Sequence, residues 1–151
     1  MHMSVIHADA SQLDAVSELF DGYRQSYGQP SDRDGSRAFI AERLAARDSV
    51  ILLAMCGSEG VGFVQLYPGF SSVAMKRIWI LNDLFVAERA RRQGVASRLL
   101  ESATAFARES GALRMVLATA VDNDAAQALY EARGWQLDTK FHHFNLILPG
   151  G

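Results

Sequence analysis

The sequence predicts a mixed α/β fold (α+β) in which helices and short strands alternate along one chain of 151 residues. Three observations lead to this class: apolar residues at helical spacing, short runs rich in β-branched and aromatic residues, and turn residues between them. A chain of this length buries about 68–70% of its unfolded surface, enough for one core. We therefore expect a single domain over residues 1–151.

The first half of the chain alternates between strands and two helices. Ser11 and Asp14 are typical helix-starting residues, and they precede an apolar face that reaches Tyr23. A second helix is expected after Pro30. The remaining apolar runs are short and are bounded by turn residues, so we expect strands at 5–7, 49–54 and 61–67.

The second half repeats the alternation. A long strand is expected to end at Val86, and the next segment carries Val95, Leu99, Ala103 and Phe106 at helical spacing before Gly111. The last expected elements are a strand at 115–120, a helix at 124–133 and a strand at 141–148. A right-handed crossover would make the strand at 115–120 parallel to the one before it.

Composition narrows the class of protein. A hydrophobic share of 49%, a charged share of 21% and a net charge of −2 are ordinary for a globular protein and exclude a general nucleic-acid binder. The chain has no run of about 20 apolar residues and no signal-peptide pattern. We expect a cytoplasmic protein with neither a nucleic-acid nor a membrane partner.

A cluster of arginines lies where the long strand meets the following helix. Arg89, Arg91, Arg92 and Arg98 face one neighbouring carboxylate, Glu88. Positive side chains at a helix start oppose the positive end of the helix dipole, so the cluster is unfavourable unless an anion binds there. The pattern therefore indicates a ligand that carries phosphate.

Common phosphate loops do not fit this segment, because Gly94 has neither a following lysine nor companion glycines. Residues 91–96 instead match Arg/Gln-x-x-Gly-x-Gly/Ala, and residues 123–135 match Asn-x-x-Ala-x-x-Leu-Tyr-Glu-x-x-Gly-aromatic. In this order the two patterns resemble those of the GNAT superfamily of N-acetyltransferases. The resemblance covers about residues 5–148 and is specific between Ile78 and Trp135.

The resemblance implies a central, mostly antiparallel sheet with two splayed parallel strands and helices on both faces. It implies transfer of an acetyl group from acetyl-CoA to a primary amine, either a small polyamine-like amine or a peptide amine, by direct attack in a ternary complex. It is compatible with a homodimer. The residues expected to bind the cofactor are Phe85, Val86, Arg91, Arg92, Gln93, Gly94, Val95, Ala96, Ser97, Asn123 and Tyr130.

Tyr130 matches the superfamily's helix tyrosine, which implies that it is a catalytic residue, the acid for the leaving thiolate. A phenol with a pKa of about 10 is a weaker acid than a thiol near 8.5, so a hydrogen bond to the thiolate is easier than full proton transfer. The alternative is a tyrosine that packs in the core.

The residue that would act as the base for the acceptor amine is less clearly indicated by the sequence. Related polyamine acetyltransferases carry Leu-Glu-Asp where this chain has Leu81-Asn82-Asp83, so Asn82 replaces the glutamate. Proton transfer from an ammonium to Asp83 would be uphill by roughly 9 kcal/mol, whereas loss to water at pH 7 costs about 4.6 kcal/mol. Asp83 is therefore expected to attract and orient the ammonium, with a structural carboxylate as the alternative.

The remaining site predictions concern the acceptor. Asn82, Asp83 and Tyr27 are the expected substrate-binding residues. Acidic residues of the first two helices, Asp14, Glu18, Asp21, Asp32 and Asp34, would suit a cationic amine, but they also follow the spacing of a solvated helix face. Two roles are open for Asn123: it could be a helix N-cap, or it could contact the pantetheine arm.

No metal site is expected, because adjacent His142 and His143 would point to opposite faces of a strand. Two functional classes stay open: a catalytic N-acetyltransferase and a non-catalytic acyl-CoA-binding regulatory module. The presence of Tyr130 favours the enzyme, and the asparagine at 82 is the feature that favours the module.

Overall fold

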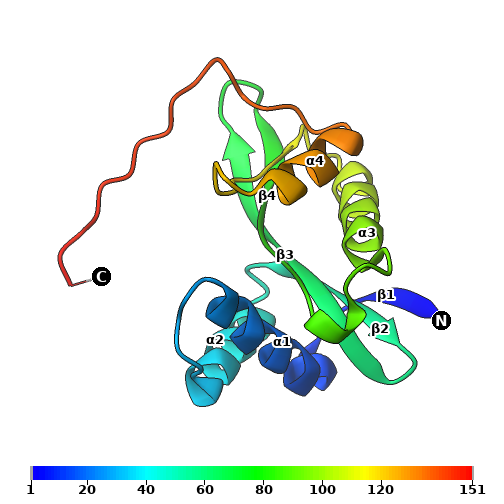
Figure 1. Cartoon of the computed structure of the whole chain (residues 1–151). Helices are drawn as coiled ribbons and strands as arrows, with labels where there is room; N and C mark the ends of the chain where they lie inside the picture. The colour runs from blue at the N-terminus through cyan, green and yellow to red at the C-terminus, as the bar shows by residue number, and fades with distance from the viewer. Residues whose placement is uncertain (1, 151) are drawn as a thin grey trace. The chain divides into compact units, whose positions relative to one another are not determined.

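The computed structural model describes residues 2–150, which form two compact units (Figure 1). The first unit ends at Ala118 and the second begins at Thr119. The elements of the first unit are β1 (Met3–His7), η1 (Ala10–Gln12), α1 (Leu13–Ser26), α2 (Arg33–Ala46), β2 (Val50–Cys56), β3 (Glu59–Ser71), β4 (Lys76–Val86), η2 (Glu88–Ala90), α3 (Val95–Glu109) and β5 (Met115–Val116). The second unit contains α4 (Asp124–Ala132).

The first unit is built on one mixed sheet. Its strand order is β1-β2-β3-β4-β5, with antiparallel pairing from β1 to β4 and parallel pairing between β4 and β5. This confirms the predicted fold class. It also confirms that the strand that begins at residue 115, β5, runs parallel to β4. Within the described residues, no helix combines the length and apolar composition needed to cross a bilayer.

Helices cover both faces of this sheet, as neighbouring residues of β3 illustrate. The ring of Phe63 packs on Phe20 of α1, with ring centroids 6.4 Å apart. A Cβ at Gly62 would instead lie 3.1 Å from Val95 and 3.3 Å from Leu99, both in α3. Because successive strand residues point to opposite faces, α1 and α3 lie on opposite sides of the sheet (Figure 1).

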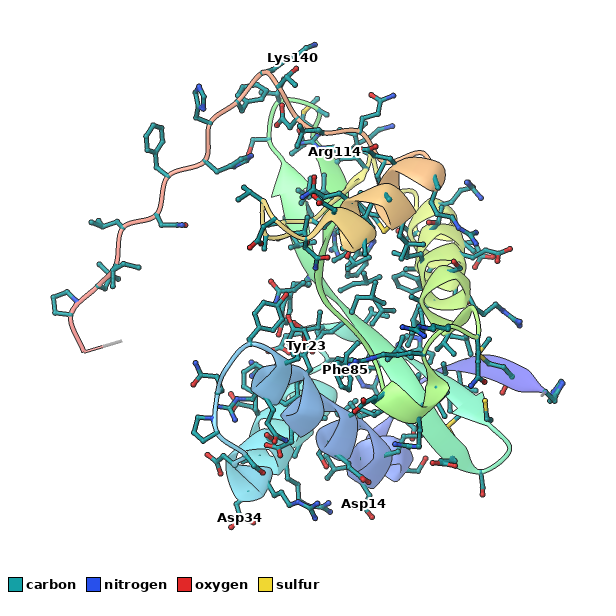
Figure 2. The ribbon with its side chains drawn as sticks, in the orientation of Figure 1. Asp14, Tyr23, Asp34, Phe85, Arg114 and Lys140 are labelled. Atoms are coloured by element: carbon teal, nitrogen blue, oxygen red, sulfur yellow. The ribbon has the colours of Figure 1, made fainter. Side chains whose placement is uncertain are left out.

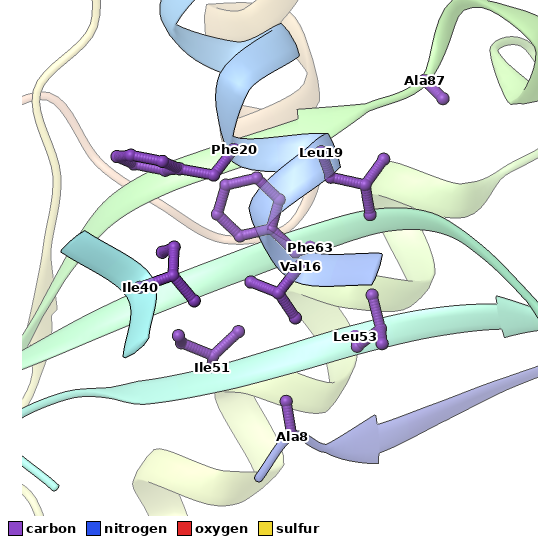
Figure 3. Packing of buried hydrophobic residues seen from close by; sticks show 9 residues of the cluster. All are labelled: Ala8, Val16, Leu19, Phe20, Ile40, Ile51, Leu53, Phe63 and Ala87. Atoms are coloured by element: carbon purple, nitrogen blue, oxygen red, sulfur yellow. The ribbon is translucent and has the colours of Figure 1, made fainter. Parts of the chain in front are cut away.

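An apolar cluster lies between the sheet and the helices α1 and α2 (Figure 3). Val16 of α1, Ile40 of α2 and Leu53 of β2 are fully buried there. On the other face, α3 buries Val95, Leu99 and Ala103, the positions that the helical spacing predicts. Gly111 follows the end of α3 with φ of 77°, which explains a glycine at this position.

A β-bulge interrupts the pairing of β3 with β4. Gln65 pairs with Asp83 and Leu66 pairs with Leu81, so Asn82 is an extra residue in β4. A bulge bends the strand that carries it. The pairing of β4 with β5 stops just before it, at Trp79 and Ile80, and the described strands leave the β5-side edge of β4 unpaired beyond that point.

Three predicted elements differ from the structure. The strand at 115–120 is confined to β5, because the bulge turns β4 away from it. Residues 141–148 form no strand, since they pair with no described strand, and Phe144 is 92% exposed. The first helix is preceded by η1, whose start is capped reciprocally by Asp9 and Gln12 rather than by Ser11.

Candidate active site

A cavity of about 230 Å³ lies in the first unit where β4 ends and α3 begins. Val86 contributes the strand side of the cavity, and Ala90 lines it from η2. The other lining residues belong to the turn and the first turn of α3: Arg91, Arg92, Gly94, Val95, Ala96 and Ser97. The structure thus brings Val86 together with most of the predicted pyrophosphate-binding residues.

The backbone of this turn is shaped to present N–H groups. Arg92 and Gly94 both have positive φ, of 64° and 80°, and a glycine adopts this conformation without strain. The first N–H groups of any helix have no intrahelical partner. No described side chain caps those at the start of α3 either. Exposed N–H groups at the positive end of a helix dipole are favourable partners for an anion.

The arginines of the cluster have different partners. Arg89 donates to a carboxylate oxygen of Glu59 at 2.6 Å and to the Gly60 carbonyl at 3.0 Å, so it anchors η2 to the β2–β3 turn. Arg91 donates through Nε to the Val86 carbonyl at 3.1 Å, next to the cavity. The prediction of four arginines opposed by one carboxylate is therefore wrong for Arg89, which Glu59 neutralises.

Asp83 lies in β4 on the face that α1 covers, with only 2% of its surface exposed. It accepts hydrogen bonds from Asn82 Nδ2, at 2.8 Å, and from Gln65 Nε2 on the neighbouring strand. Burial raises the pKa of its carboxyl above the usual range, and the bonds from Asn82 and Gln65 oppose that shift. Asp83 is thus a nearly buried carboxylate in a polar network.

Two tyrosines complete the surroundings of Asp83, and neither is among the predicted catalytic, cofactor-binding or substrate-binding residues. The Tyr23 hydroxyl of α1 donates to the Asn82 carbonyl at 3.2 Å, and burial followed by the Asp83 charge raises the pKa of Tyr23. Burial, with Asp83 as the second cause, also raises the pKa of Tyr67 to about 12. The sequence feature that could have indicated a polar network here is Gln65, a polar residue inside an apolar strand.

Tyr27, the third predicted substrate-binding residue, lies one turn beyond Tyr23 and is 70% exposed. Its ring centroid is 5.1 Å from that of Tyr23. Asn82 is exposed at the bulge and Asp83 is buried below it. The structure therefore places Tyr27 on the solvent side, Tyr23 next to it, and Asn82 of β4 beyond Tyr23.

Most of the acidic residues of α1 and α2 have structural partners. Asp21 is buried and accepts bonds from Ser31 Oγ, Asp32 N and Ser36 Oγ, which hold the loop between the helices. The bond from Ser31 is the main reason that the pKa of Asp21 is lowered. Asp32 caps α2 and Asp14 pairs with Arg37, so these carboxylates do not form one acceptor surface.

The second predicted motif organises the ends of α4 in the second unit. Asn123 Oδ1 accepts from the Ala126 N–H at 3.2 Å, so Asn123 is the N-cap. Gly134 has a φ of 91°, and the Trp135 N–H donates to the Tyr130 carbonyl at 3.0 Å. The rings of Tyr130 and Trp135 have centroids 6.0 Å apart, so the motif has a local packing role.

Comparison with known proteins identifies the family. The family model for the acetyltransferase (GNAT) family matches residues 14–135, which include both predicted motifs. The chain belongs to the GNAT acetyltransferase family. This confirms the resemblance on which the sequence predictions depend.

Two relatives of this GNAT acetyltransferase match it along nearly their whole length. The chain is 46% identical over 147 residues to the uncharacterized N-acetyltransferase YhfO of Bacillus subtilis, covering 97% of this chain and 99% of that protein. A solved structure described as a probable acetyltransferase has a TM-score of 0.91 at 46% identity and covers 96% of this chain and 97% of its own.

A more distant solved structure shares the fold alone. Aminoglycoside N-acetyltransferase AAC(6')-Iy in complex with CoA has a TM-score of 0.79 at 20% identity, covering 96% of this chain and 95% of that chain. A protein of this architecture has thus been solved with coenzyme A bound.

Proposed function

We propose that this GNAT acetyltransferase, as one domain over residues 1–151, moves an acetyl group from acetyl-CoA to a primary amine. One observation carries the proposal: the uncapped start of α3 and its turn form a cavity against the end of β4. A pyrophosphate there would accept hydrogen bonds from the N–H groups of residues 94–97 and meet the charge of Arg91 and Arg92.

The proposed path of the pantetheine arm starts at this turn and runs along β4. No described strand pairs with the β5-side edge of β4 beyond Ile80, so the backbone groups of Leu84 and the N–H of Val86 are available to amides of the arm, while the Val86 carbonyl accepts from Arg91. A backbone N–H of this edge would also donate to the thioester carbonyl as negative charge develops there. Val86 enters the proposal through its backbone. Phe85 is a neighbour of the path rather than a donor, because its backbone pairs with Phe63 of β3 and its ring packs toward α1.

The proposed reaction needs no covalent enzyme intermediate. The ammonium form of the acceptor loses one proton to water, and the nitrogen of the resulting neutral amine attacks the thioester carbon. The C–N bond forms, the C–S bond breaks, the nitrogen loses its second proton and the sulfur departs with one. Asp83, with Asn82 beside it, orients the incoming ammonium, and the proton arithmetic assigns the deprotonation to solvent. Tyr27 lines the approach of the amine with an exposed ring.

Tyr130 is the proposed donor to the leaving thiolate. This assignment depends on the motif match over residues 123–135, which lies within the segment that the family model covers. A hydrogen bond from the phenol would stabilise the sulfur while its bond to carbon breaks. Asn123 uses Oδ1 for the N-cap, so its Nδ2 is the group proposed to meet the pantetheine arm.

The test combines binding with turnover. Calorimetry would measure acetyl-CoA binding, and a thiol reagent would then measure release of CoA in the presence of each amine of a panel that includes diamines, polyamines, aminoglycosides and peptides. The proposal expects binding and amine-dependent thiol release, with both substrates required before any release. Binding without release for every amine would favour the acyl-CoA-binding module, and absence of binding would contradict both functions.

A further inference from the structure

At the bulge, β4 lacks the strand pairing that holds its other residues. Asn82 has no partner in β3, because Gln65 and Leu66 pair with the residues on either side of it. Parallel pairing with β5 ends at Ile80, so β5 does not support the bulge either. Beyond the bulge, residues 83–86 pair with β3 again, so Asn82 itself is the residue that the β3 ladder does not hold. A contact from outside the sheet to Asn82 therefore bears on the angle at which residues 84–86 leave the bulge.

Tyr23 supplies such a contact from α1. Its hydroxyl donates to the Asn82 carbonyl at 3.2 Å, across 59 residues of sequence. Its ring is held between aromatic neighbours, with centroids 5.9 Å from Phe63, 6.3 Å from Phe85 and 5.1 Å from Tyr27. Figure 2 shows Tyr23 and Phe85 near each other where α1 meets β4.

The ring contacts give this single hydrogen bond a fixed direction. A tyrosine has only two side-chain torsions, and neighbouring rings on several sides leave the phenol little freedom. A second acceptor, the Asp83 carboxylate, also lies within hydrogen-bonding reach of the hydroxyl. Since a phenol has one proton, Tyr23 can serve only one of these acceptors at a time.

We infer that Tyr23 is a positioning residue: its hydroxyl holds the bulged Asn82 carbonyl and so fixes the course of residues 84–86 along the site. The inference rests on the proposed function, in which this edge meets the acyl-CoA. Tyr23 acts through the strand and is assigned no contact with reacting atoms. Because a shift of about 1 Å at a reacting centre can cost about 100-fold in rate, a held edge matters for turnover.

The experiment compares Tyr23→Phe with the wild-type chain and with Ser26→Ala. The phenylalanine keeps the ring and removes the hydroxyl alone. Ser26→Ala removes a hydroxyl from the same helix, where it donates to the Tyr23 carbonyl at 2.6 Å. Hydrogen exchange of the peptide that spans residues 83–86 is measured beside that of β2, and steady-state kinetics follow.

We expect Tyr23→Phe to speed exchange in residues 83–86 by about 2- to 10-fold, the range for loss of one neutral hydrogen bond, with β2 unchanged. Turnover should fall by about 10-fold while the KM for acetyl-CoA stays within about 2-fold. Ser26→Ala should match the wild type in both measurements. Exchange in Tyr23→Phe equal to that of Ser26→Ala would overturn the inference.

The same substitution in an Asp83→Ala background, which removes the side-chain acceptor at 83, separates the two acceptors. If Tyr23 acts through the Asn82 carbonyl, Tyr23→Phe still speeds exchange in residues 83–86 in that background. If the effect vanishes there, Tyr23 acts on the Asp83 carboxylate, and the inference is wrong. Exchange needs no substrate, so a wild-type chain that acetylates no amine would contradict the proposed function and leave this comparison decisive.

Discussion

The ring of Phe85 lies 3.1 Å from the point where a Cβ on Gly22 would stand. Gly22 is inside α1 and has no positive φ that would call for glycine. A glycine in a helix interior is usually unfavourable, so its presence here indicates that α1 and β4 need this close approach. The contact sets the distance between the helix that carries Tyr23 and the strand that carries Asp83.

Gly22→Ala tests this approach. At an open helix position the change would stabilise a protein by up to about 1 kcal/mol, but here the added methyl group must displace the Phe85 ring. We expect a destabilisation of about 1 kcal/mol, measured by denaturant unfolding. In a Phe85→Leu background the same change should stabilise. A full stabilising effect in the wild-type background would show that the contact is not restrictive.

The turn at the start of α3 can be tested by affinity. Arg91→Ala should raise the Kd for acetyl-CoA by about 10-fold or more, the range for a hydrogen bond to a charged group. Gly94→Pro should weaken binding further, because proline cannot adopt a φ of 80° and removes a donor. Arg108→Ala, an equal charge change in the last turn of α3, is the control and should bind normally. Calorimetry with all three variants decides the matter.

Tyr130→Phe separates chemistry from packing. It removes only the hydroxyl, so acetyl-CoA affinity should stay near that of the wild type while turnover falls by about 10- to 1000-fold. Trp135→Phe changes the ring that packs on Tyr130 and serves as the control, with a much smaller loss expected. Equal losses of turnover in the two variants would assign Tyr130 to packing.

Two buried aspartates should give opposite pH dependences of stability. The pKa of Asp83 is raised above its ordinary value of 3.8, so its contribution to stability falls as the pH rises through that shifted pKa. The pKa of Asp21 is lowered from the same value, so its contribution is present above 3.8 and is lost as the pH falls through the lowered pKa.

Melting temperatures of Asp83→Asn and Asp21→Asn, each relative to the wild type over an acidic-to-neutral pH series, test the two signs. With rising pH the relative stability of Asp83→Asn should improve, and that of Asp21→Asn should worsen. Two differences that move in the same direction would contradict the assigned environments.

Elements with a clear apolar period could be predicted from the sequence. Val95, Leu99 and Ala103 occupy the buried face of α3, as their spacing predicts, and the strand that ends at Val86 is β4. Residues 141–148 are rich in aromatic and branched apolar residues but form no strand, because a strand is defined by its partner and composition alone does not supply one. Asp9 and Gln12 have the residue types and spacing of a capping box, which places the cap two residues before Ser11.

The polar network around Asp83 could be predicted only in part. Asp83 stood out as a carboxylate in an apolar strand, but the bulge at Asn82 depends on the register with Gln65, which no local pattern encodes. The contact from Tyr23 joins residues 59 positions apart, and at helical spacing Tyr23 reads as one more apolar position of α1. Long-range register and packing therefore account for what the sequence did not reveal.

The most direct test of the account is detection of the transferred group itself. Acetyl-CoA with an isotope-labelled acetyl group is incubated with the wild-type chain and the amine panel, and products are analysed by mass spectrometry. The account predicts a labelled N-acetyl amide on at least one primary amine, formed by the wild type and by Arg108→Ala but strongly reduced in Gly94→Pro. Labelled amide formed equally well by Gly94→Pro, or by none of the three proteins, would contradict it.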